Sequence, residues 1–215
     1  MEIVEQKQKV TRAYNFEVRA EHDEKNGYHI VGRAIVYGSK TNIGCFDEVI
    51  EAGALDGADL RDVRFLVNHD TSMIPLARSR RNNENSTMQL IVDKEGLSIR
   101  VNLDIENNSD AKNLYSAIKR GDITGMSFMF NVDDEEWENL ESDHPTRHIR
   151  KIGVVFEVSA VTFPAYEATE ISTRAKETLE SVRRTLESVR AKESLDSDKD
   201  KLELEKLKAK YLYNI

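Results

Sequence analysis

The sequence predicts a mainly β protein with some α structure, an α+β class in which an antiparallel barrel or sandwich is followed by a helical tail. Three observations carry this prediction. Short runs of alternating apolar and polar residues recur along the first 160 residues or so, one segment of helical period lies between them, and the period changes to that of a helix beyond Pro164. We therefore expect two domains, residues 1–173 and 174–215.

The first strands are expected at residues 14–19, where every second residue is apolar, and at residues 28–37. Asn26 and Gly27 lie between the two runs and are typical of a hairpin turn. Gly32, inside the second run, indicates a bulge or a close approach of backbone.

Residues 46–62 mix Gly, Asp and Ala with short apolar pieces, which favours a loop with a short helix. Residues 63–67 alternate and predict a strand, and His69 comes just past its end. The clearest strand covers residues 96–105 and is expected to pair with residues 88–92.

One amphipathic helix is expected next. Ser109 or Asp110 can cap it, and Gly121 supplies a left-handed stop. Two further strands are predicted at residues 123–132 and 149–163. The acidic segment DDEEWENLESDHP between them is expected to be an irregular, mobile loop.

The tail contains the repeat TLESVRR–TLESVRA, whose apolar residues have the 3–4 spacing of a coiled coil. A Ser/Asp/Lys linker at residues 194–201 should separate it from a second amphipathic piece, LELEKLKAKYLY. One helix alone cannot bury the apolar stripe that these residues form, so we expect a partner or a homo-oligomer.

Composition excludes several classes of function. A formal net charge of -8 opposes general attraction to a phosphate backbone, so no nucleic-acid partner is expected. The chain has neither an apolar secretory leader nor about 18 consecutive apolar residues, so no membrane partner is expected. Cys45 is the single cysteine, which fits an intracellular setting.

Three residues are candidates for catalytic chemistry. Ser127 follows a glycine by two positions, a spacing that lets substrate backbone approach a nucleophilic hydroxyl, although it also fits an ordinary strand serine. His69 could take the serine proton near neutral pH. Glu157 lies among apolar residues, so it either faces solvent or has a partner such as a histidine.

Two competing groups are less favoured. His144 and His148 have the spacing of a helical metal pair, but Pro145 opposes a helix there, and no metal or other cofactor is expected. Cys45 with His69 could form a thiol dyad, yet Cys45 lies in a loop without any oxyanion feature.

Six ordered blocks, taken together, resemble the caudovirus prohead serine protease family, whose fold is similar to that of the herpesvirus assemblins. They span roughly 150 residues and are GRAIVYG, FDEVIEAGA, VNHD, GLSI, GMSFMF and EVSAVTFPA.

The resemblance implies a serine endopeptidase that cleaves scaffold and capsid proteins, and usually itself, within the assembling procapsid in the host cytoplasm. His69 would be the general base, Ser127 the nucleophile and Glu157 the residue that orients the imidazole. His144 and His148 stay open as rivals of Glu157, because assemblins use a second histidine.

The motifs do not identify the groups that would stabilise the oxyanion. Phe128 and Met129 depart from the smaller residues common in the family, so the oxyanion donors are expected among the backbone N–H groups near Ser127, with help from Arg78 or Arg80. The alternative function is an inactive assembly or scaffold protein that acts through the helical tail.

Overall fold

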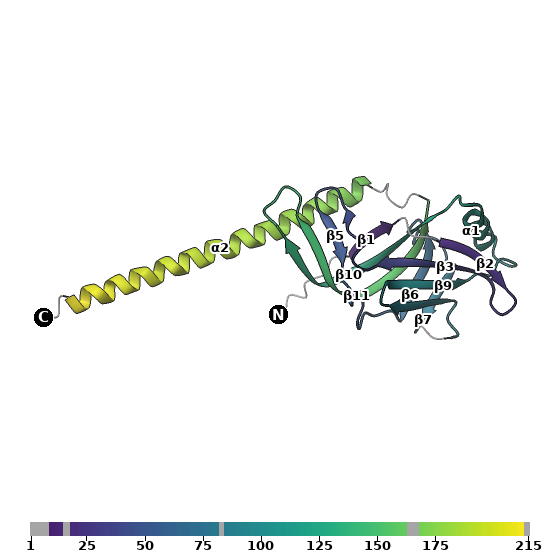
Figure 1. The fold of residues 1–215 in the computed structure, drawn as a ribbon, viewed down its shortest axis with the longest axis horizontal. Coiled ribbons are helices and arrows are strands. Elements are labelled where there is room, and N and C mark those ends of the chain that lie inside the picture. The colour runs from purple at the N-terminus through teal and green to yellow at the C-terminus, as the bar shows by residue number, and fades with distance from the viewer. Residues whose placement is uncertain (1–8, 15–17, 82–83, 163–167, 213–215) are drawn as a thin grey trace. The chain divides into compact units, whose positions relative to one another are not determined.

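The computed structural model describes residues 9–14, 18–81, 84–162 and 168–212, and the chain divides into two compact units, residues 1–172 and 173–215 (Figure 1). The first unit consists mainly of strands, which confirms the mainly β prediction. Its strands are β1 (Lys9–Tyr14), β2 (Val18–Asp23), β3 (Gly27–Val36), β4 (Thr41–Asn42), β5 (Asp47–Ile50), β6 (Asp62–Val67), β7 (Ala77–Arg80), β8 (Met88–Asp93), β9 (Gly96–Asn102), β10 (Gly125–Glu138) and β11 (Thr146–Val161).

Seven strands form a mixed sheet with the order β1-β10-β11-β5-β4, and β6 pairs with both β11 and β7. The long strands β10 and β11 are antiparallel, whereas β11 runs parallel to β5 and to β6. The antiparallel barrel or sandwich predicted from the sequence is confirmed only in part, because this larger sheet is mixed and the described strands do not close into a barrel. Parallel partners reach β11 through long connections that strand-by-strand alternation does not reveal.

The other four strands form an antiparallel sheet with the order β2-β3-β9-β8. The hairpin predicted between residues 88–92 and 96–105 is present, and a turn at Asn26 and Gly27 leads into β3 as expected, although the strand before it is β2. A register irregularity in β3 falls between Arg33 and Ile35, close to the bulge expected at Gly32. The strand expected over residues 14–19 is wrong, because β1 ends at Tyr14 and β2 begins at Val18 in the other sheet. Residues 15–17 lie outside the described residues.

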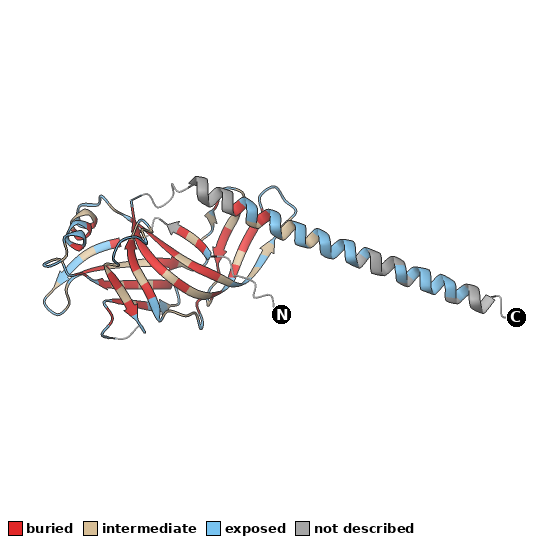
Figure 2. Cartoon of the chain, turned by 180° about the vertical axis from the view of Figure 1, so that it is seen from behind, coloured by how far each residue is buried: buried red, intermediate tan, exposed pale blue. Residues whose placement is uncertain are grey.

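One apolar core joins the two sheets. It contains Phe65, Phe128 and Phe130 from the mixed sheet together with Ile30 and Leu97 from the antiparallel one, all 0% exposed. Figure 2 shows this burial concentrated on the strands. Because Phe128 and Phe130 alternate with Ser127 and Met129 along β10, the aromatic core occupies one face of that strand and Ser127 lies on the other.

Residues 47–50 form strand β5, so the loop with a short helix predicted over residues 46–62 is wrong, and turns follow β5 as far as residue 57. Val49 and Ile50 are buried, and β5 pairs in parallel with the first part of β11. A four-residue strand is too short for its alternation to be recognised, and only its distant partner defines it.

The acidic segment after Asp133 continues β10 and is not an irregular loop throughout. Pairing runs on until Glu138 lies opposite Thr146. Cross-strand ion pairs neutralise this part of the ladder, for example Glu136 with Arg150. The prediction was wrong because it counted the acidic charge without the basic residues of the partner strand.

Helix α1 (Ser109–Arg120) lies where the sequence predicts it and ends at Gly121, which has a φ of 79°. The N-cap is Asn108, one residue before the predicted Ser109, because its side chain accepts hydrogen bonds from the N–H groups of Asp110 and Ala111.

Helix α2 (Ala168–Leu212) forms the second unit from residue 173 onward and confirms a helical tail. It runs through residues 194–201 without interruption, so the predicted linker is wrong: Ser, Asp and Lys do not break a helix as Pro or Gly does. None of the described helices is long and apolar enough to cross a membrane.

Candidate active site

Ser127 lies in the first half of β10, on the face opposite the aromatic core. It is 0% exposed, and its hydroxyl donates a hydrogen bond of 2.8 Å to the carbonyl oxygen of Arg12 in β1. In the antiparallel ladders it stands opposite Ala13 of β1 and Ser159 of β11. The side chains of Ser127 and Ser159 therefore lie on the same face, because directly opposed residues share a face of the sheet.

Glu157 lies two residues before Ser159, so its side chain is on that same face. The carboxylate is almost completely buried, at 3% exposed, and its Oε2 accepts a hydrogen bond of 2.6 Å from the Ser159 hydroxyl. The sequence left open whether Glu157 faces solvent or has a partner, and the structure gives it partners.

His69 approaches this face from the end of β6. Its Nδ1 lies 2.6 Å from Oε1 of Glu157, and its backbone N–H donates to the Ser159 hydroxyl at 3.2 Å. Because β6 is the parallel neighbour of β11, with Leu66 beside Ser159, the chain leaves β6 close to this polar face.

A tight backbone turn aims the imidazole. Asn68 and His69 both have positive φ, 51° and 58°, a conformation that non-glycine residues seldom adopt and that Asn tolerates best. The Asn68 amide is held by Thr162, whose N–H donates to Asn68 Oδ1 at 2.9 Å and whose hydroxyl accepts from Nδ2 at 3.2 Å. The end of β11 thus fixes the turn that carries His69.

The three residues selected from the sequence are consequently assembled on one face of one sheet. Glu157 binds His69 directly, and Ser127 stands on the neighbouring strand opposite the serine that contacts both of them. A carboxylate on Nδ1 holds an imidazole in the tautomer that carries its acceptor at Nε2, the arrangement needed to take a proton from a hydroxyl.

A second, largely buried polar cluster lies beside β10. Glu48 of β5, 1% exposed, accepts from Arg12 Nε and Nη2 at 2.5 and 2.7 Å and from Arg147 Nη1 at 3.2 Å. Burial opposes ionisation of Glu48, but the two guanidinium groups outweigh it and hold the pKa of this carboxyl below its usual value. Arg147 also binds Glu135 of β10, so the cluster ties four strands together.

His144 and His148, the rivals for the orienting role, lie far from His69. His144 Nε2 contacts Asp47 at 2.9 Å, and His148 stands at the third position of β11. Nine residues of strand separate His148 from Glu157, roughly 30 Å at the usual rise per residue. Neither histidine is placed to orient His69 in this structure.

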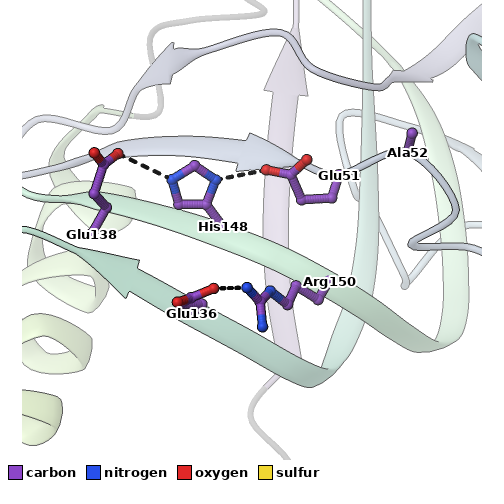
Figure 3. Close-up of a pocket in the computed structure, with 6 residues that line it drawn as sticks. All are labelled: Glu51, Ala52, Glu136, Glu138, His148 and Arg150. Carbon is purple, nitrogen blue, oxygen red and sulfur yellow. Dashed lines mark hydrogen bonds and ion pairs between the residues drawn. The ribbon is translucent and has the colours of Figure 1, made fainter.

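His148 instead lines an acidic pocket of about 550 Å³ (Figure 3). Its Nδ1 lies 2.6 Å from Glu51 and its Nε2 lies 3.5 Å from Glu138, while Arg150 pairs with Glu136 across the pocket. No group of His, Cys, Asp and Glu among the described residues is arranged to hold a metal ion.

The remaining sequence candidates also lie apart from this face. Cys45 precedes β5, which pairs with the beginning of β11, whereas His69 lies at the other end of that strand. Arg78 binds Asp62 through Nε at 2.5 Å, at the end of β6 farthest from His69, and Arg80 is the residue opposite Asp62 in the ladder. No arginine named from the sequence reaches Ser127.

Ser159 and Asn68 are the site residues that sequence reasoning missed. Both lie inside the blocks EVSAVTFPA and VNHD that carry the family resemblance, so a signal was present. It could not be interpreted, because the role of Ser159 depends on a strand pairing between residues about 90 positions apart.

A buried serine on β10, an imidazole on the turn after β6 and a buried carboxylate on its Nδ1 are the kinds of side chain that serine hydrolases use. Comparison with known proteins narrows this class. The sequence model of the caudovirus prohead serine proteases matches residues 14–184, and the chain belongs to that family. It is 28% identical over 172 residues to the prohead protease of Enterobacteria phage HK97, covering 78% of this chain and 69% of that protein. No solved structure gave a significant match. The chain is thus a serine protease of phage capsid maturation.

Proposed function

We propose that this protease cleaves scaffold and major capsid proteins, and itself, inside the assembling procapsid in the host cytoplasm, with Ser127 as nucleophile, His69 as general base and Glu157 as the orienting carboxylate. The observation that carries the assignment is the 2.6 Å contact between His69 Nδ1 and Glu157 Oε1 on the face of the sheet that holds Ser127.

The reaction follows from these positions. The Ser127 oxygen attacks the carbonyl carbon of the substrate peptide while His69 Nε2 takes the hydroxyl proton, and the imidazolium is stabilised by Glu157. When the C–N bond breaks, His69 returns the proton to the leaving amine. Water then hydrolyses the acyl-enzyme with His69 again as base, which restores the Ser127 hydroxyl.

Labelling with a fluorophosphonate tests the nucleophile. We expect the probe to attach to Ser127 in the folded protein, and Ser127→Ala to lose labelling and substrate cleavage while keeping its folded circular dichroism spectrum. Glu157→Gln should lower the labelling rate by about 10⁴-fold, the effect that the corresponding Asp→Asn change has in trypsin-like proteases. Unchanged capsid processing by Ser127→Ala would refute the assignment.

The alternative is an inactive assembly protein that works through its helix. One observation favours it, the complete burial of the Ser127 side chain. The same labelling experiment separates the two functions, because an inactive protein would not react at Ser127 faster than its heat-denatured form.

Helix α2 would be a partner-binding element, either for scaffold or for a second copy of the chain. Val189, Leu202 and Leu204 are large apolar residues that are 44 to 54% exposed on it, as in a helix that lacks its binding partner. A chain ending at residue 172 should keep Ser127 labelling, and the full chain should show concentration-dependent activity if it self-associates. Loss of labelling in a folded truncated chain would contradict a separable tail.

A further inference from the structure

The edge of the mixed sheet beside Ser127 is occupied by β1. This strand pairs only with β10 among the described strands, and Ala13 stands opposite Ser127. The Ser127 hydroxyl is hydrogen-bonded to the main-chain carbonyl of Arg12 and is buried. A substrate carbonyl would have to reach this same hydroxyl, so a substrate and β1 compete for one position.

The side chain of Arg12 lies in a polar cluster whose other residues come from strands other than β1. Glu48 comes from β5 and Arg147 from β11, both in the body of the sheet, and Glu48 binds the Arg12 guanidinium with both oxygens. A buried carboxylate with this fork geometry is a preformed acceptor for a basic side chain. It would recognise one on any extended segment that lay along β10.

The other contacts of β1 are weakly selective. Pairing with β10 uses main-chain groups, which every extended peptide possesses. Lys9 is exposed and lies 4.6 Å from the centre of the Phe156 ring, and Val10 is buried against the core. Arg12 is therefore the most specific anchor in the strand.

We propose that the β10 edge is the peptide-binding site of the protease, that it takes an extended segment whose arginine or lysine reaches Glu48, and that β1 is an internal occupant which substrate displaces. This inference rests on the proposed role of Ser127. It assigns Glu48 to substrate selection and residues 9–14 to the closed state of the enzyme.

Weakening the anchor should open the site. In the full-length protein, Arg12→Ala should raise the rate of fluorophosphonate labelling of Ser127 at least ten-fold. The matched control is Arg33→Ala, which removes an arginine paired with Asp93 in the other sheet and should leave the rate unchanged. Labelling of Arg12→Ala at the wild-type rate would overturn the inference.

A reversible disulfide between β1 and β10 tests the same inference if Arg12→Ala fails to fold. Thr11 and Met129 are directly opposed, so Thr11→Cys with Met129→Cys in a Cys45→Ser background should form a disulfide, verified by mass. The oxidised protein should label at least ten-fold more slowly than after reduction. Equal rates before and after reduction would show that β1 need not move.

Peptides test the selection of a basic residue. The hexapeptide KVTRAY, the sequence of β1, should slow labelling of the Arg12→Ala variant, with at least ten-fold higher inhibitory potency than KVTQAY. Equal potency would refute a role for Glu48 in selection.

If Ser127 is labelled in no folded variant, the proposed function itself fails, whereas equal labelling of all variants refutes only the role of β1.

Discussion

Ser159→Ala is the substitution that most directly tests how the site is held together. The hydroxyl is 0% exposed, donates to the Glu157 carboxylate at 2.6 Å and accepts from the His69 N–H at 3.2 Å. A buried hydrogen bond to a charged group contributes about 1.5–3 kcal/mol and a neutral one about 0.5–1.5 kcal/mol. The variant should therefore lose about 2 to 4 kcal/mol of unfolding free energy. A misplaced imidazole should also slow labelling of Ser127 by about 10²-fold.

The assay combines urea denaturation with the rate of fluorophosphonate labelling, and Ser79→Ala is its control. Ser79 is equally buried in the same sheet but makes one neutral hydrogen bond, 2.6 Å to the Leu60 carbonyl. The control should lose about 1 kcal/mol and label normally. If Ser159→Ala labels as fast as Ser79→Ala, the hydroxyl does not position His69, and the reasoning from the shared face is refuted.

Two further predictions concern the antiparallel sheet. Gly96 has a φ of 141°, and a Cβ there would lie 2.0 Å from the Ile35 carbonyl oxygen. Gly96→Ala should therefore cost at least about 3 kcal/mol of unfolding free energy. Gly27→Ala is the control and should cost about 1 kcal/mol, because nothing lies within 4 Å of a Cβ added there. The hydrogen bond from Arg33 lowers the pKa of Asp93 from 3.8 to about 2. Because the folded pKa is the lower one, this pair stabilises the protein fully above about pH 4 and its contribution is lost as the pH falls through 2. Arg33→Ala should reduce the dependence of the unfolding free energy on pH in that range. An unchanged dependence would contradict this prediction.

Local patterns predicted the local elements well. The alternation in β9 and the helical spacing with a following Gly121 in α1 are complete within a dozen residues, so both were found from sequence. Strand β5 and the outer half of β10 were missed, because their stabilising contacts come from β11. The acidic residues of β10 look unfit for a sheet until Arg147 pairs with Glu135 and Arg150 with Glu136.

The sequence by itself indicated the mainly β class and the helical tail through periodic patterns within short stretches, and it pointed to the three residues proposed for catalysis through the six blocks that resemble the prohead protease family. Only the tertiary structure decided that Glu157 binds His69, that Ser159 contacts both, and that β1 covers Ser127. These relations depend on which strands become neighbours. Pairing is set by burial summed over the whole sheet, and no single segment carries that information.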